Sequence, residues 1–198
     1  MLVAAKLEEI NPPAASDFAS LSSNTYNTKD ILSMELQICL SLKFDLYHTT
    51  PIQFMESYLH AACQHEMVDK HKLKHVALYL LELSLLEYSF VQFPCSMLAA
   101  TAVYLAKIIV CKARGNATVK SDKLATVDAT YWDATLSFYT GYDLPDLKEP
   151  VQRLFLVHHK AETASFHQAV FLRCQQKGLV NEALRTKLEL KDVGFPVE

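Results

Sequence analysis

The chain has 198 residues, 51% of them hydrophobic, and a formal net charge of -3 at pH 7. A chain of this length can bury a sizeable core, as one large domain or two small ones. The charge and the lack of any long basic run argue against nucleic acid as the main partner, because phosphate binding needs clustered lysine and arginine. We therefore expect no nucleic-acid partner.

The residue pattern is helical. The chain has only four glycines, and each falls where a helical period stops, while strand-like alternation is scarce. These features predict an all-α fold. The five cysteines include no C-x-x-C pair, which indicates a reduced intracellular compartment.

No membrane segment is predicted. The longest apolar run, residues 95–111, contains Lys107 and is short for a membrane span, so we interpret it as a buried core helix. The apolar first residues are followed at once by Lys6, Glu8 and Glu9, which does not resemble a secretory signal. We expect no membrane partner.

The chain starts within a helical pattern, because residues 1–7 place apolar side chains on one face with no capping residue before them. We interpret this as a chain that lacks earlier N-terminal helices. Asn11 is then expected to cap a short helix that has Pro12 at its first position and runs through Ala14 to Phe18.

A longer helix is predicted after Thr28, which is a suitable N-cap. One wide apolar arc and one polar stripe of Ser33, Gln37 and Ser41 follow a helical period. The apolar arc contains Ile31, Met34, Ile38, Cys39 and Leu42.

Glu35 interrupts that apolar arc. A buried carboxylate without a partner is costly, so it is expected to find a cation. Lys6, which also lies among apolar neighbours, is the nearest suitable one. We predict that Lys6 and Glu35 lie on adjacent helices and face a shared surface.

Further helices are predicted along the rest of the chain. Thr50 and Pro51 begin one by a cap-plus-proline pattern, and helical patterns follow over residues 72–89, 95–114, 131–139, 147–162, 164–177 and 181–189. Residues 115–128 are polar and aperiodic, which indicates an exposed insertion. His158 and His159 are expected to lie at a solvated helix end.

Two chemical alternatives, a zinc site and a nucleophilic thiol, have little support in the sequence. A zinc site would need four ligands that converge on one point. The histidines and the cysteine of residues 60–75 have a spacing that does not suit this: His60, Cys63, His65, His71 and His75. A nucleophilic thiol at Cys39, Cys95 or Cys111 would need a nearby histidine, yet all three fall on apolar helix faces. We expect no metal, no cofactor and no catalytic residues, with a small helical enzyme as the least favoured alternative.

Four motifs in order resemble the mitotic cyclins of the A and B types. They are AKLEEINPP at residues 5–13, TYNTKDILSME at 25–35, FDL at 44–46 followed by Thr50 and Pro51, and YLLELSLLEY at 79–88 followed by Phe93 and Pro94. The resemblance runs in register from residue 1 to about residue 160. Trp132 also matches a tryptophan of the family.

The resemblance implies a cyclin fold. Residues 1–48 would be the C-terminal part of a first five-helix cyclin box, 49–162 a complete second box, and 163–198 a helical C-terminal extension. The first helices of box one, with the substrate-docking patch, have no counterpart in this sequence.

The resemblance also implies a function: a non-enzymatic regulatory subunit that binds and activates a cyclin-dependent kinase in cell-cycle control, in the nucleus and cytoplasm. The family's kinase contacts carry over to Val3, Lys6, Leu7, Glu35, Cys39, Phe44 and Leu46. Leu7 replaces an aromatic residue of the family, and Cys39 a leucine or isoleucine. The alternative is a cyclin-fold interaction module that binds other helices without activating a kinase.

Overall fold

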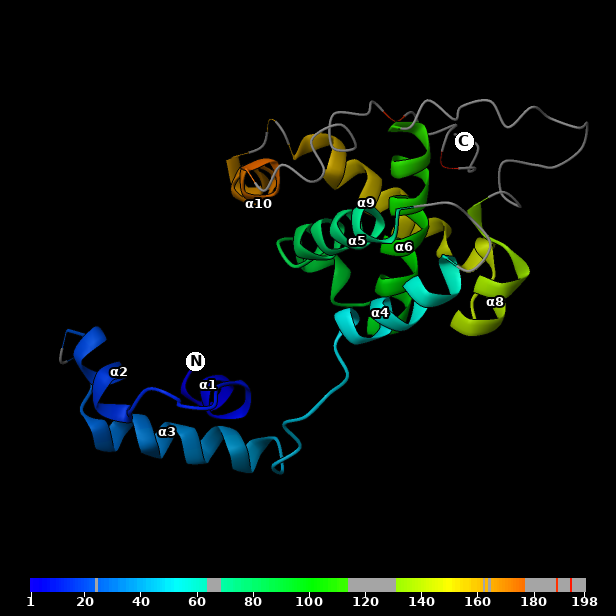
Figure 1. Ribbon diagram of the computed structural model, residues 1–198. Coiled ribbons are helices and arrows are strands. Elements are labelled where there is room, and N and C mark those ends of the chain that lie inside the picture. Colours follow the sequence, from blue (N-terminus) through cyan, green and yellow to red (C-terminus); the bar gives the residue numbers. More distant parts are fainter. Residues whose placement is uncertain are drawn as a thin grey trace, which may run out of the picture. The chain divides into compact units, whose positions relative to one another are not determined.

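The computed structural model describes residues 1–23, 25–63, 69–113, 131–161, 163, 165–176, 188 and 193 (Figure 1). Every regular element within these residues is helical, which agrees with the predicted all-α class. The chain divides into two compact units, Met1–His48 and Thr49–Glu198, and each is described by itself.

Unit 1 consists of α1 (Leu2–Glu8), α2 (Ala15–Leu21) and α3 (Thr28–Ser41), drawn in blue in Figure 1. Helix α2 packs against α3. Few side chains of this unit are buried. Leu2, Ala19 and Cys39 are the buried ones among its described residues, so unit 1 has a thin core.

The two predicted caps of unit 1 are wrong by a few residues. Helix α2 begins after Ala14, whose backbone N–H donates to Asp17 Oδ2 at 2.9 Å, and neither Asn11 nor Pro12 belongs to it. Helix α3 begins after Asn27, not Thr28. Asn27 Oδ1 accepts from the Asp30 N–H at 3.0 Å and Asp30 Oδ2 accepts from the Asn27 N–H at 2.9 Å. This reciprocal pair satisfies two helix-end donors, which a cap at Thr28 would not do.

Unit 2 is built around one apolar helix. The elements are α4 (Pro51–Ala62), α5 (Lys70–Ser84), η1 (Tyr88–Phe90), α6 (Cys95–Ala113), α8 (Ala134–Thr140), η2 (Leu144–Leu147), α9 (Lys148–Lys160) and α10 (Ser165–Gln176). Helix α6 packs against α4, α5, α8 and α9, and all its residues from Ala99 to Val110 are buried. Alanines at 99, 100, 102 and 106 let the neighbouring helices approach closely.

Helix α6 is the one described helix that is long and apolar enough to cross a membrane, with 19 residues and a mean hydropathy of 1.6. However, 72% of its apolar window is buried inside unit 2. Its apolar side chains are therefore used by the core, as the sequence predicted for residues 95–111.

Long-range hydrogen bonds fix the outer elements of unit 2. The Tyr104 hydroxyl donates to the Val193 carbonyl at 3.0 Å, and Trp132 Nε1 donates to the Tyr142 carbonyl at 3.2 Å. Helix α10, within the predicted C-terminal extension, packs on α5 and adds the ion pair between Arg173 and Glu82. The predicted insertion at 115–128 and the tail helix at 181–189, Leu188 apart, lie outside the described residues.

His158 does not lie at a solvated end as expected. It is buried beneath α5, with Nδ1 3.1 Å from the Tyr79 hydroxyl and its ring edge-on to the Tyr79 ring. Removal from water, with a smaller contribution from the neighbouring His159, lowers the pKa of His158 to about 4. The next residue, His159, is exposed as predicted.

Candidate protein-interaction surface

Lys6 and Glu35 form a two-pronged ion pair between α1 and α3. Lys6 Nζ lies 2.8 Å from Glu35 Oε1 and 2.9 Å from Oε2. The prediction that Lys6 is the partner of Glu35 on a neighbouring helix is therefore confirmed. The pair is less buried than expected, because the Lys6 side chain is 46% exposed and that of Glu35 17%.

The pair retains hydrogen-bonding capacity. An ammonium group has three donors, and two of them point at Glu35. A carboxylate can accept about four hydrogen bonds, of which Lys6 supplies two. The remaining donor and acceptors can bind the backbone of a partner. As a contribution to folding, a pair this exposed is worth about 0–1 kcal/mol.

The apolar residues predicted for the same surface differ in exposure. Phe44 is 61% exposed and Leu7 50%, so each offers a large apolar group to a partner. Val3 and Leu46 are partly buried. Cys39 is only 8% exposed, so its side chain contributes mainly to the core of unit 1.

Backbone contacts connect part of this set. Cys39 follows Glu35 by one helical turn on α3, and the Phe44 N–H donates to the Cys39 carbonyl at 2.8 Å. Val3 lines the same hollow as Glu35. The structure thus brings Val3, Lys6, Glu35, Cys39 and Phe44 into one region of unit 1. The hydrogen bonds and the hollow described for this region involve neither Leu7 nor Leu46.

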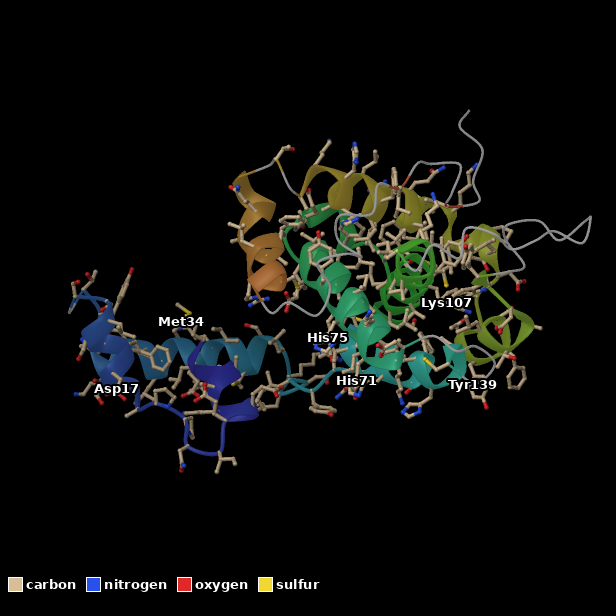
Figure 2. All side chains as sticks on the ribbon, turned by 45° about the horizontal axis from the view of Figure 1, so that its top comes forward. Asp17, Met34, His71, His75, Lys107 and Tyr139 are labelled. Carbon is tan, nitrogen blue, oxygen red and sulfur yellow. The ribbon has the colours of Figure 1, made fainter. Side chains whose placement is uncertain are left out.

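An apolar hollow of about 670 Å³ lies beside the ion pair. Its apolar walls come from all three helices of unit 1, and Figure 2 shows the Met34 side chain projecting from α3. The main apolar lining residues are Leu2, Val3, Phe18, Ile31, Met34 and Ile38. Met34 is 55% exposed, so the hollow is open to solvent.

Sequence reasoning missed a second exposed apolar row on α3. Leu32, Leu36 and Leu40 are spaced four residues apart and all are exposed. Their i, i+4, i+8 spacing is the signal in the sequence that could have identified this row. Helix α3 therefore carries exposed apolar side chains on two sides, in addition to the polar stripe of Ser33, Gln37 and Ser41.

The histidine and cysteine alternatives gain no support within the described residues. There, no group of three His, Cys, Asp or Glu side chains could hold a metal ion, and His65 lies outside that part of the chain. His60 Nδ1 is 3.3 Å from Lys70 Nζ, and His75 Nδ1 is 2.6 Å from the His71 carbonyl. Cys39 is buried, whereas Cys95 is exposed rather than on an apolar face.

Two helical units, each matched by a family profile, define the class of protein. The C-terminal domain of cyclins matches residues 49–181, and the N-terminal domain of cyclins matches residues 1–47. The chain therefore belongs to the cyclin family, in agreement with the resemblance read from its motifs.

The curated relatives that the chain matches include A-type cyclins. It is 34% identical over 197 residues to Cyclin-A2-3 of Arabidopsis thaliana, covering 98% of this chain and 40% of the relative. It is 38% identical over 162 residues to Cyclin-A1-4 of Oryza sativa, covering 79% of this chain and 41% of the relative. It is 34% identical over 164 residues to the G2/mitotic-specific cyclin-A of Hydra viridissima, covering 82% of this chain and 34% of the relative. The chain thus spans less than half the length of these relatives.

Proposed function

We propose that this chain is a regulatory subunit that binds and activates a cyclin-dependent protein kinase during the cell cycle, in the nucleus and cytoplasm. Membership of the cyclin family supports the proposal, and the Lys6–Glu35 pair is the observation that carries it. Both residues lie in the motifs that resemble the family's kinase contacts, and the pair keeps a donor and acceptors directed at no described residue.

The chain would supply no chemistry of its own. Its contacts would favour the active arrangement of the kinase's C-helix, so that binding energy shifts the kinase toward a conformation it already samples. Lys6 and Glu35 would hydrogen-bond the backbone around that helix. Exposed Phe44 and Leu7 would cover its apolar side chains, at about 25 cal/mol per Å² of apolar surface removed from water.

The first test is binding of a purified kinase catalytic subunit to the parent chain, Lys6→Ala and Glu35→Ala. Each substitution should lower affinity at least tenfold, because a charged hydrogen bond at an interface is worth about 1.5–3 kcal/mol. Lys74→Ala is the matched control: it removes the exposed Lys74–Glu56 pair of unit 2, which has the same 2.8 Å separation. Unchanged affinity in both unit 1 variants would sink the proposal.

The apolar hollow favours one alternative, a cyclin-fold interaction module that binds a helix without activating a kinase. An open apolar hollow of about 670 Å³ on a small unit is the kind of surface that other helices cover. Sedimentation of the parent chain and of Met34→Glu tests this. Association that Met34→Glu abolishes, together with absence of kinase activation, would favour the alternative over the first proposal.

A further inference from the structure

The chain leaves α3 through an unusual turn. Leu42 ends the helix, and the next two residues, Lys43 and Phe44, have φ values of +53° and +59°. Neither is glycine, and side chains with a Cβ atom rarely adopt this left-handed conformation because the Cβ approaches the backbone carbonyl. Two such residues in succession indicate a turn that the surrounding contacts enforce.

Two backbone hydrogen bonds enforce it. The Lys43 N–H donates to the Leu40 carbonyl at 3.0 Å, and the Phe44 N–H donates to the Cys39 carbonyl at 2.8 Å. This is the Schellman pattern of a helix C-terminus, in which the first residue after the cap is left-handed and is usually glycine. Here Lys43 occupies the glycine position.

The turn fixes the position of the Phe44 backbone. Its hydrogen bond folds the chain back so that Phe44 lies against the last turn of α3, at the level of Cys39. Phe44 nevertheless stays 61% exposed. An exposed aromatic ring on a fixed backbone loses little conformational freedom on binding, and such residues often dominate the affinity of an interface.

We propose that Lys43 is a positioning residue, whose left-handed backbone presents Phe44 for binding to the kinase. The inference rests on the proposed function and adds to it a residue that acts through its backbone conformation. Lys43 itself is exposed, and the role proposed for it lies in its backbone conformation.

Two substitutions separate conformation from charge in the 198-residue chain. Lys43→Gly and Lys43→Val remove the same charge, but glycine adopts the left-handed region freely and β-branched valine resists it. Against a purified cyclin-dependent kinase catalytic subunit without its own cyclin, Lys43→Gly should bind as tightly as the parent or tighter. Lys43→Val should bind about five- to tenfold more weakly. Lys43→Asn, which tolerates this conformation, should restore most of the affinity.

A double-mutant cycle shows whether Lys43 acts through Phe44. In a Phe44→Ala background the difference between glycine and valine at position 43 should fall below twofold. A difference that persists would mean that valine merely disrupts α3, and it would overturn the inference. Equal affinity of the glycine and valine variants in the parent background would also overturn it while leaving the proposed function standing. A parent chain that does not bind the kinase would reject both.

Discussion

Lys6 and Glu35 lie in different motifs, and each stands out in the sequence because its neighbours are apolar. The cost of an unpaired charge in such surroundings was enough to predict their pairing. Their exposure could not be predicted, because it depends on which other groups cover α1. The structure leaves Lys6 nearly half exposed and Glu35 largely covered, so the pair offers its remaining hydrogen-bonding groups at the surface.

A charge exchange between the two residues distinguishes a structural pair from a binding device. The double variant Lys6→Glu with Glu35→Lys can still form an ion pair between α1 and α3. We expect its helical content to match that of the parent by circular dichroism. We expect kinase affinity to remain at least tenfold reduced, because donors and acceptors are interchanged; recovery of affinity would show that the pair is only structural.

His158 gives unit 2 a pH-dependent stability. Its pKa in the folded chain is about 4, against an ordinary value of 6.5. The unfolded chain therefore binds more protons between these values, and the free energy of unfolding must rise with pH across that range. The stabilising effect is complete above about pH 6.5 and is lost as the pH falls to about 4. Its size is on the order of 3 kcal/mol.

Urea unfolding followed by the fluorescence of Trp132, the single tryptophan, measures this effect. His158→Asn keeps a polar group near the Tyr79 hydroxyl but cannot be protonated, so it should flatten the dependence between pH 4 and pH 6.5. His60→Asn, at an exposed histidine of α4, should retain it. Equal slopes in the two variants would contradict a buried neutral His158.

The sequence predicted some helix ends correctly and others incorrectly. Thr50 and Pro51 were correctly predicted to begin α4, since proline at the first helical position is a strong signal. Helix α5 was predicted to reach residue 89 but ends at Ser84. Residues 85–89 contain neither glycine nor proline, and the chain turns there into η1 because Phe90 is drawn into the core.

The cap of α3 gives a stability prediction at the level of one element. Asn27→Ala removes the side-chain oxygen that accepts from the Asp30 N–H but keeps the backbone N–H that donates to Asp30 Oδ2, and it should destabilise unit 1 by about 1 kcal/mol. Thr28→Ala, one residue later, should change it by a few tenths at most. Amide hydrogen exchange of α3 in the 198-residue chain measures both. A larger loss of stability in Thr28→Ala than in Asn27→Ala would mean that Thr28 is the N-cap of α3.

The packing of α6 gives a second stability prediction for a single element. Ala106 is fully buried, so Ala106→Leu should cost unit 2 about 1–3 kcal/mol through overpacking. Ala134, at the exposed start of α8, is the matched control, and Ala134→Leu should change the stability little. Urea midpoints that shift equally in the two variants would mean that α6 is less closely packed than described.

At the scale of the whole molecule, the motifs were more informative than composition. Composition and periodicity predicted the helical class, but only the ordered runs around Lys6, Glu35 and Tyr79 identified the cyclin family. They could not predict the open hollow of unit 1 or the burial of His158. Both depend on how helices distant in the sequence come together: the hollow on α1, α2 and α3, and His158 on the packing of α5 against α9.

The division into two units leads to a prediction about the whole chain. The proposed kinase contacts all belong to unit 1, whereas nearly all of the buried core belongs to unit 2. Residues 49–198 alone should therefore keep the Trp132-monitored unfolding transition of the parent and fail to bind the kinase. Calorimetric titration of kinase with this fragment tests the second half, and binding equal to that of the parent would place the contacts elsewhere.

The most direct test of the central claim is a kinase activity titration. A purified, inactive cyclin-dependent kinase would be mixed with increasing amounts of this chain, with a complete A-type cyclin as positive control and Lys6→Ala and Glu35→Ala as matched variants. We predict saturable activation by the parent chain that both variants lose. No activation by the parent, under conditions in which the complete cyclin activates the same kinase, would contradict the account.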